Sequence, residues 1–235
     1  GILFLYMALD RPFRNWYTNV IIMKSSTNLI EQLRLLPHFS KKTILQLGGQ
    51  LKLKKGSVDT YISRFLTRKE IIRLKKGLYV AADYFNKNRG DISYSFYLAN
   101  ILRKPSYISS WTALQYYNLT TESIYTITSI TPKITRTYKT KAGTFTYQSI
   151  KKELFSDFSL VKGTPTSPTG KYDFFIASPP KALFDLLYFK THQFRGVRYS
   201  DLNMLIEELR IDIEEMSRKD RVAFYAMMKR YFNHE

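Results

Sequence analysis

The sequence predicts an α+β protein: an N-terminal winged helix-turn-helix, followed by a mixed α/β C-terminal domain with a helical C-terminal tail. Three patterns predict this fold. Short helical patterns lead into a two-stranded hairpin, Thr- and Tyr-rich stretches with a period of two residues come next, and the chain closes on helical patterns. The 235 residues are enough for one or two domains.

The first domain is expected over residues 23–85 and begins with three helices. Apolar residues at helical spacing predict a helix over 28–36, ending before a proline. Ser40 is a favourable N-cap for a second helix, which Gly48-Gly49 stops. Ser57 opens a third helix that runs to about Arg68.

A short hairpin succeeds the third helix. Ile71–Leu74 and Leu78–Val80 predict two strands, and Lys75-Lys76-Gly77 supplies a turn with its glycine in place. Three helices and a hairpin within about 55 residues are typical of a winged helix-turn-helix. The polar stretch 86–91 is interpreted as a flexible linker to the second domain.

Charge indicates the class of partner. The chain has 37 Lys and Arg against 19 Asp and Glu, a formal net charge of +18. Residues 1–85 carry 15 basic and five acidic side chains, and residues 86–235 carry 22 and 14. The net positive charge per residue is therefore about twice as high in the first part. Such a surplus favours a polyanion such as DNA. No apolar run approaches the ~20 residues of a spanning helix, so no membrane partner is expected.

The third helix carries the pattern of a DNA-reading element. At 100° per residue, Val58, Ile62, Phe65 and Leu66 fall on one stripe that must face the core. The opposite face carries hydroxyls and Arg64, which suits a duplex groove because Arg grips guanine bidentately. Lysines before the helix and at the hairpin tip suit phosphate contacts. The candidate DNA-binding residues are Lys41, Lys42, Lys52, Lys54, Lys55, Ser57, Thr60, Tyr61, Ser63, Arg64, Thr67, Arg68, Lys75 and Lys76.

The second domain is expected over residues 91–235. Ser217 and Asp220 have the spacing of a capping box at the start of the last helix. The prolines and glycines of 164–170 predict a surface loop. Helices are predicted over 93–102, 110–117, 181–190, 200–209 and 217–232, and strands over 125–130, 133–138, 144–150 and 172–176.

Enzyme motifs are absent from the sequence. It holds no glycine-rich phosphate loop, no Gly-x-Ser-x-Gly and no His-Glu-x-x-His, and its three histidines are scattered. Without Cys, thiol catalysis and Cys-ligated metals are excluded. The acidic residues of 207–215 fit either a metal site or, as we favour, a solvated face. We therefore expect no enzyme, with no catalytic, cofactor-binding or metal-binding residues.

Several segments, taken together in order and spacing, resemble the AbiEi antitoxin family of type IV toxin–antitoxin (abortive infection) systems. The resemblance covers roughly residues 26–190. The segments are Ile72–Val80, Tyr107–Leu114, Tyr116–Leu119, Thr128–Thr131, Gly143–Tyr147 and Ile176–Tyr188. The chain departs from the family pattern at Pro180, where Glu is more usual before the Lys-Ala-Leu run; this is a helix-start position, so no functional loss is expected.

The resemblance implies a function in phage resistance. Such antitoxins repress their own operon by binding inverted repeats in its promoter through the winged helix. Their C-terminal domain counteracts a cognate nucleotidyltransferase toxin, generally without a stable complex. We expect a cytoplasmic protein, which the absence of Cys suits, that is monomeric when free. Two copies on an inverted repeat would satisfy the symmetry of the operator.

Other interpretations stay open at this stage. The second domain of a winged-helix regulator can instead sense a small ligand, which a defined apolar pocket with convergent polar groups would favour, or bind RNA. Residues 1–22 differ in pattern from the rest of the chain, and Met23 reads like a natural start. We interpret 1–22 as an extension before the first domain, which is non-native if Met23 is the start.

Overall fold

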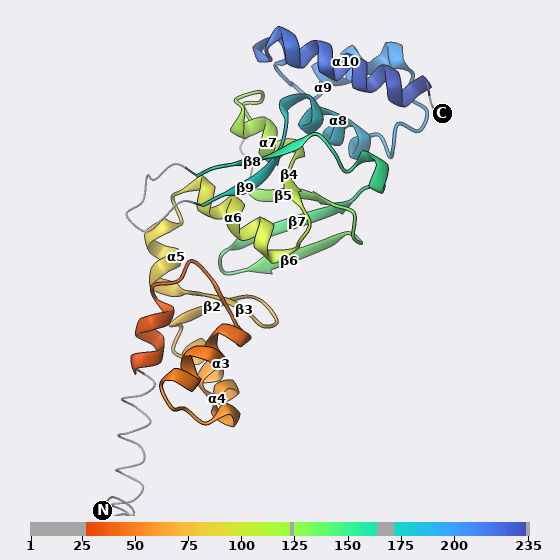
Figure 1. The fold of residues 1–235 in the computed structure, drawn as a ribbon. Helices are drawn as coiled ribbons and strands as arrows, with labels where there is room; N and C mark the ends of the chain where they lie inside the picture. The colour runs from red at the N-terminus through yellow and green to blue at the C-terminus, as the bar shows by residue number, and fades with distance from the viewer. Residues whose placement is uncertain (1–26, 123–124, 164–171, 234–235) are drawn as a thin grey trace, which may run out of the picture. The chain divides into compact units, whose positions relative to one another are not determined.

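The computed structural model describes residues 27–122, 125–163 and 172–233 (Figure 1). It is a mixed α and β structure in which the described residues form two sheets. The chain divides into two compact units, the first ending at Asn88 and the second beginning at Arg89. The predicted extension 1–22 and the predicted loop 164–170 lie outside the described residues.

The first unit combines helices with a small antiparallel sheet, in the order β1-β3-β2. Its first described helical residues are 27–33. Its further elements are β1 (Phe39–Ser40), α3 (Lys41–Gln50), the 3-10 helix η1 (Lys55–Ser57), α4 (Val58–Thr67), β2 (Ile71–Lys75), β3 (Leu78–Ala81) and α5 (Ala82–Asn88).

Local chemistry explains where α3 begins, but not where it ends. The Ser40 hydroxyl accepts from the Thr43 N–H at 3.1 Å, and Thr43 Oγ1 accepts from the Ser40 N–H at 3.3 Å, which is a capping box. The predicted stop at Gly48-Gly49 is wrong, because α3 continues to Gln50. Gly48 is buried in α3, with Leu53 within van der Waals distance of where a Cβ would stand. Packing therefore overrides the low helix propensity of glycine.

The predicted hairpin is confirmed. Strands β2 and β3 pair with Ile72 opposite Val80, and Gly77 takes a φ of +79° in the turn between them. Only glycine adopts this conformation without strain, which fixes the turn at this position. The expectation of a flexible linker over 86–91 is partly wrong, because α5 continues to Asn88, whose buried side chain donates to the Tyr84 carbonyl at 2.8 Å.

The second unit is built on a six-stranded mixed sheet in the order β6-β7-β5-β4-β9-β8. Its elements are α6 (Ile92–Leu102), β4 (Tyr107–Ile108), α7 (Ser110–Tyr116), β5 (Thr126–Thr131), β6 (Arg136–Thr140), β7 (Gly143–Ser149), η2 (Lys152–Leu154), β8 (Phe158–Val161), β9 (Phe174–Ala177), α8 (Pro179–Lys190), η3 (Tyr199–Asp201), α9 (Leu202–Glu208), η4 (Ile213–Glu215) and α10 (Arg218–Asn233).

Helices cover both faces of this sheet. Adjacent residues of β7 show it: the Tyr147 hydroxyl donates to the Ala99 carbonyl of α6 at 2.6 Å, whereas Thr146 lines a hollow with Trp111 of α7 and Leu186 of α8. Successive strand residues point to opposite faces, so α6 lies on one face and α7 with α8 on the other (Figure 1). Helix α10 packs on α8.

Two strands of this sheet, β4 and β8, were not predicted from the sequence. Strand β4 has only two residues and β8 is an edge strand, yet β4 lies between β5 and β9 and pairs with both. The predicted strand 133–138 is also shifted, since β6 spans Arg136–Thr140. A two-residue strand carries no alternation pattern, so its partners alone define it.

Candidate nucleic-acid interface

Helix α4 has one buried and one exposed face. Val58, Ile62 and Phe65 are buried as predicted, whereas Leu66 is only half-buried. The predicted outward face is confirmed as exposed at Thr60, Ser63, Arg64, Thr67 and Arg68. The helix therefore presents hydroxyl and guanidinium groups to solvent, with one acidic residue, Asp59, among them.

Tyr61 is not part of that exposed face. Its side chain is 4% exposed, and its ring stacks on Phe65 with centroids 6.3 Å apart, so its predicted place beside the exposed residues is wrong. Tyr61 lies three residues after Val58 and four before Phe65, which puts it on the core side of the helix. The apolar stripe is therefore wider than the narrow one that the sequence suggested.

The basic residues around α4 occupy three places in the first unit. Lys52, Lys54 and Lys55 are exposed between α3 and α4, and Ser57 ends η1 just before α4 without a capping bond. Lys75 is half-buried at the end of β2, and Lys76 is exposed in the turn. The remaining candidates, Lys41 and Lys42, begin α3, and α3 and α4 contact each other (Figure 1).

Two of the candidate residues are already engaged within the protein. Lys41 Nζ lies 2.7 Å from Asp59 Oδ1, an exposed ion pair that links α3 to α4. The Thr67 hydroxyl donates to the Ser63 carbonyl at 3.0 Å, so it offers its lone pairs rather than its proton to a ligand. Arg64 of α4 and Arg68, the residue that follows the helix, are thus exposed cations that can hydrogen-bond to an acceptor outside the chain.

The described part of the first unit is strongly basic. Residues 27–88 hold 13 Lys and Arg against four Asp and Glu. An exposed helix face with arginines and hydroxyls, flanked by exposed lysines, suits a polyanion: lysines bind phosphates, and Arg pairs with base edges. These are the side-chain types that proteins use to contact DNA.

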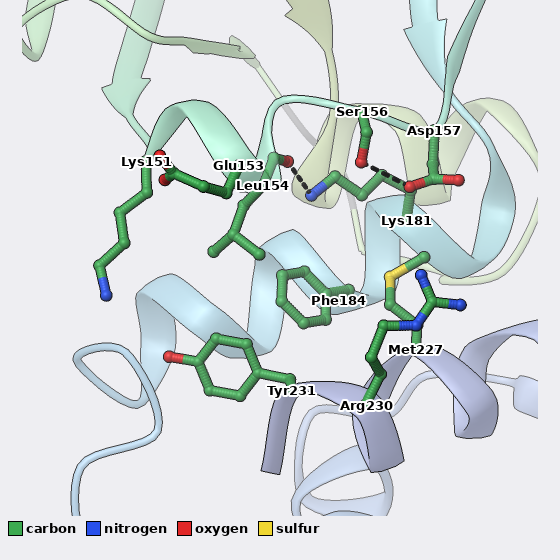
Figure 2. A pocket seen from close by; sticks show the side chains of 10 residues that line it. All are labelled: Lys151, Glu153, Leu154, Ser156, Asp157, Lys181, Phe184, Met227, Arg230 and Tyr231. Atoms are coloured by element: carbon green, nitrogen blue, oxygen red, sulfur yellow. Dashed lines mark hydrogen bonds between the residues drawn. The ribbon is translucent and has the colours of Figure 1, made fainter. Parts of the chain in front are cut away.

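The second unit contains a different candidate site, a cavity of about 480 Å³ (Figure 2). Lys181 and Phe184 of α8 lie at its centre, and Met227, Arg230 and Tyr231 of α10 form one wall. The segment from Lys151 to Asp157 lines the opposite side. Its rim carries both cations and carboxylates, so its charge favours neither anions nor cations.

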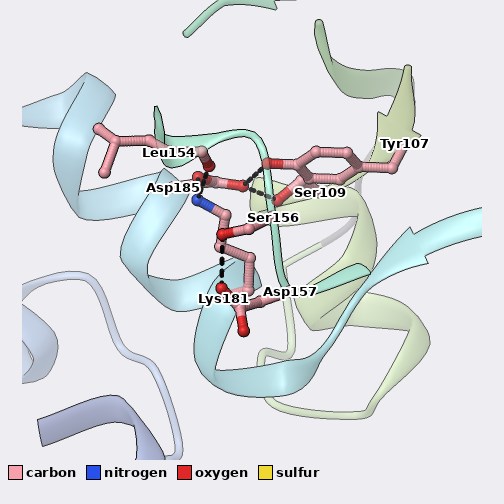
Figure 3. Close-up of polar contacts among 7 residues, drawn as sticks. All are labelled: Tyr107, Ser109, Leu154, Ser156, Asp157, Lys181 and Asp185. Carbon is pink, nitrogen blue, oxygen red and sulfur yellow. Dashed lines mark hydrogen bonds and ion pairs between the residues drawn. The ribbon is translucent and has the colours of Figure 1, made fainter. Parts of the chain in front are cut away.

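The polar centre beside this cavity is a buried cluster on Asp185 (Figure 3). Tyr107 and Ser109 donate their hydroxyls to Asp185 Oδ2 at 3.0 and 2.7 Å, and Lys181 Nζ lies 2.8 Å from Oδ1. Lys181 also donates to the Leu154 carbonyl at 2.7 Å. These contacts tie α8 to β4 and to η2.

The burial of this cluster fits a structural role better than a catalytic one. Burial raises the pKa of Asp185, against the opposing effects of Lys181, Ser109 and Tyr107. Asp185 is fully buried and Lys181 is 1% exposed, so neither charged group faces solvent. Lys181 and Asp185 were not among the residues predicted to form a site. The signal that marks them is a Lys–Asp pair four residues apart within the mainly apolar part of α8.

Other site classes find no support in the described residues. Within 27–122, 125–163 and 172–233, no group of three or more His, Asp or Glu is arranged to hold a metal ion. None of the helices within these ranges is both long and apolar enough to cross a membrane. The sequence matches no known family model and none of the curated proteins.

Proposed function

We propose that this chain is a cytoplasmic antitoxin of a type IV toxin–antitoxin system that also represses its own operon. In this proposal the first unit is a winged helix-turn-helix, with α4 as the recognition helix and the β2–β3 hairpin as the wing. The observation that carries the proposal is the exposed face of α4, where Arg64 and Arg68 lie among hydroxyl side chains.

The arrangement of the first unit supports DNA as the ligand. Helix α4 comes after α3 with a short basic connection, and its C-terminal end leads into the hairpin whose turn carries exposed Lys76. A recognition helix enters the major groove while flanking elements contact the backbone. Two copies on an inverted repeat would match the two-fold symmetry of the operator.

The second unit is assigned the antitoxin activity. This assignment rests on the family resemblance of residues 26–190 rather than on any group of side chains. The partner is a nucleotidyltransferase toxin, which the antitoxin counteracts without a stable complex. The boundary at Asn88 and Arg89 allows the two activities to be separated by substitutions confined to one unit.

The first experiment is fluorescence anisotropy of the full chain at near-physiological salt. It compares the DNA upstream of the gene with a scrambled duplex and with a matched RNA. We expect the chain to prefer the upstream DNA. Arg64→Ala should lose this preference, and Lys87→Ala, which removes an exposed cation of α5, should keep it. Equal, salt-sensitive binding to all three nucleic acids would contradict the proposed repression.

A second experiment separates the two proposed activities in cells. Arg64→Ala is expected to release a promoter reporter from repression while it still rescues cells that express the neighbouring toxin gene. Loss of rescue in this variant, at unchanged protein level, would contradict the division of labour between the units.

A further inference from the structure

The second unit has another cavity, of about 310 Å³, away from the Lys181 cluster. Tyr97, Asn100 and Ile101 of α6 line one side, and Phe155, Phe158 and Phe175 line another. The segment from Lys104 to Ser106, just before β4, completes it together with Asp173. Its volume is at the lower end of the range for small-molecule sites, about 300–1,000 Å³.

The cavity lies next to the point where the pairing between β4 and β9 stops. These parallel strands share the single register pair Ile108 and Ile176. Beyond it, Asn100 bridges the two backbones: its Oδ1 accepts from the Phe175 N–H at 2.6 Å, and its Nδ2 lies 3.5 Å from the Ser106 carbonyl. A side chain from α6 thus connects the two backbones where the strands no longer pair.

Aromatic rings make the walls of this cavity. Phe155 and Phe158 have ring centroids 5.0 Å apart, and Phe158 and Phe175 meet edge to face at 5.9 Å. Phe175 is 41% exposed, an unusual exposure for a phenylalanine in the middle of a strand. The walls therefore offer stacking surfaces to a flat ring.

The lining also includes one buried serine, Ser106. The residue Ser106 is 5% exposed, and its hydroxyl has no hydrogen-bond partner among the described residues. A buried hydroxyl without a partner destabilises the protein, which is a reason to expect a ligand atom there. An aromatic slot with a hydroxyl group selects a flat ring that has hydrogen-bonding atoms on its edge.

The lining of the cavity carries one cation, Lys104, and one carboxylate, Asp173. Lys104 is exposed at the mouth, and Lys133 Nζ donates to the Lys104 carbonyl at 2.6 Å, which brings a second ammonium group to this side. Asp173 is the carboxylate of the lining, and its Oδ1 accepts from the Gly163 N–H at 3.2 Å. A phosphate attached to the bound ring would meet Lys104 of the lining, with Lys133 as the neighbouring cation outside the lining.

We propose that this cavity binds a nucleobase, stacked on the Phe155–Phe158–Phe175 wall and hydrogen-bonded to Ser106, with its phosphate toward Lys104 and Lys133. Proteins recognise the unstacked bases of single-stranded nucleic acid in this way, by stacking them on aromatic side chains and hydrogen bonding to their edges. The base comes either from a free nucleotide or from single-stranded RNA. The proposal is independent of the DNA-binding role of the first unit.

The test is isothermal titration calorimetry on the full chain. The probes are adenosine and guanosine 5′-monophosphate and a short single-stranded oligoribonucleotide, with ribose 5-phosphate and L-phenylalanine as controls. The base-containing probes are expected to bind, and neither control. The source of the base is the mononucleotide if AMP or GMP binds more tightly than the oligonucleotide, and RNA if the order is reversed.

Three variants locate the site. Phe175→Ala is expected to weaken binding about fivefold or more, the loss of one stacking contact. Leu160→Ala is the matched control, because Leu160 is directly opposite Phe175 on β8 and 47% exposed but does not line the cavity. Ser106→Ala is expected to raise the melting temperature of the free protein and yet weaken binding.

The opposite results would overturn the proposal. These are no binding of any base-containing probe at millimolar concentration, equal binding of ribose 5-phosphate, or equal effects of Phe175→Ala and Leu160→Ala. Unchanged affinity in Ser106→Ala would likewise overturn the assigned hydrogen bond. Circular dichroism of each variant confirms that it is folded before its affinity is compared.

Discussion

Lys181 and Asp185 form an ion pair with 2.8 Å between Nζ and Oδ1, and both side chains are at most 1% exposed. They lie one turn apart on α8, so the pair is preset by the helix. The pair also makes tertiary contacts. Asp185 accepts from the hydroxyls of Tyr107, in β4, and Ser109, the residue after β4, and Lys181 donates to the Leu154 carbonyl of η2. One pair thus joins a helix to two segments that are distant in sequence.

Breaking this pair should destabilise the second unit. Lys181→Met leaves the Asp185 carboxylate buried without its cation, and the expected loss is about 3–5 kcal/mol in the free energy of unfolding. The measurement is urea unfolding followed by circular dichroism. Lys190→Met, on the same helix but exposed, should change stability by less than about 0.5 kcal/mol. Equal effects of the two substitutions would show that the buried pair does not hold the unit together.

Alkaline pH should weaken the fold through Tyr117. Burial raises the pKa of Tyr117 from 10.0 to about 12, and its hydroxyl donates to the Ala177 carbonyl at 2.9 Å. Between these values the unfolded chain loses the proton and the folded chain keeps it, so this contribution to stability is complete below pH 10 and is lost as pH rises through 12.

The substitution Tyr117→Phe isolates this effect. It should cost about 0.5–1.5 kcal/mol at about pH 8 by removing the hydrogen bond, and the gap to the wild type should narrow by about pH 11.5. Urea unfolding at both pH values measures the gap. Tyr125→Phe, at a residue 91% exposed, should show no gap at either pH. A gap for Tyr117→Phe that widens with pH would contradict the direction of the shift.

The two faces of α4 should respond differently to truncation. Tyr61→Ala removes a buried ring that stacks on Phe65 and should cost about 3 kcal/mol or more. Thr60→Ala, one residue earlier and exposed, should stay within about 0.5 kcal/mol of the wild type. Thermal and urea unfolding of both variants measure this contrast. Similar losses would mean that α4 is not oriented as described.

Arg64 should read bases rather than phosphates. In Arg64→Lys the charge remains but the bidentate fork is lost, so affinity for the operator should fall by about 1–3 kcal/mol while binding to scrambled DNA stays unchanged. Anisotropy titrations with both duplexes measure the two affinities. A parallel loss on both duplexes would assign Arg64 to the DNA backbone instead.

Lys76, exposed in the hairpin turn, should show the opposite behaviour. Lys76→Ala removes one phosphate contact, so it should weaken all duplexes alike and reduce the slope of log K against log salt by about 0.9. Titrations at several salt concentrations give the slope. A sequence-dependent loss with an unchanged slope would remove the hairpin from the proposed set of phosphate contacts.

Elements with local signals could be predicted from the sequence alone. The Ser40 cap, the Gly77 turn and the apolar stripe Val58–Ile62–Phe65 each depend on residues within a few positions of one another, and each is present in the structure. The exposed face of α4 results from the same helical period. The exposure of most candidate DNA-binding residues of this helix could therefore be predicted before the fold was known.

Features that depend on distant partners required the folded structure. Strand β4 is two residues long and is defined by β5 and β9, and Gly48-Gly49 stays helical because Leu53 packs against Gly48. Tyr61 is buried because the buried face of α4 is wider than the predicted apolar stripe. The charge of Lys181 gives no hint of its burial, since that burial depends on a carboxylate, two hydroxyls and a carbonyl that folding brings together. Sequence spacing encodes periodicity along one element, and it does not encode which segments meet.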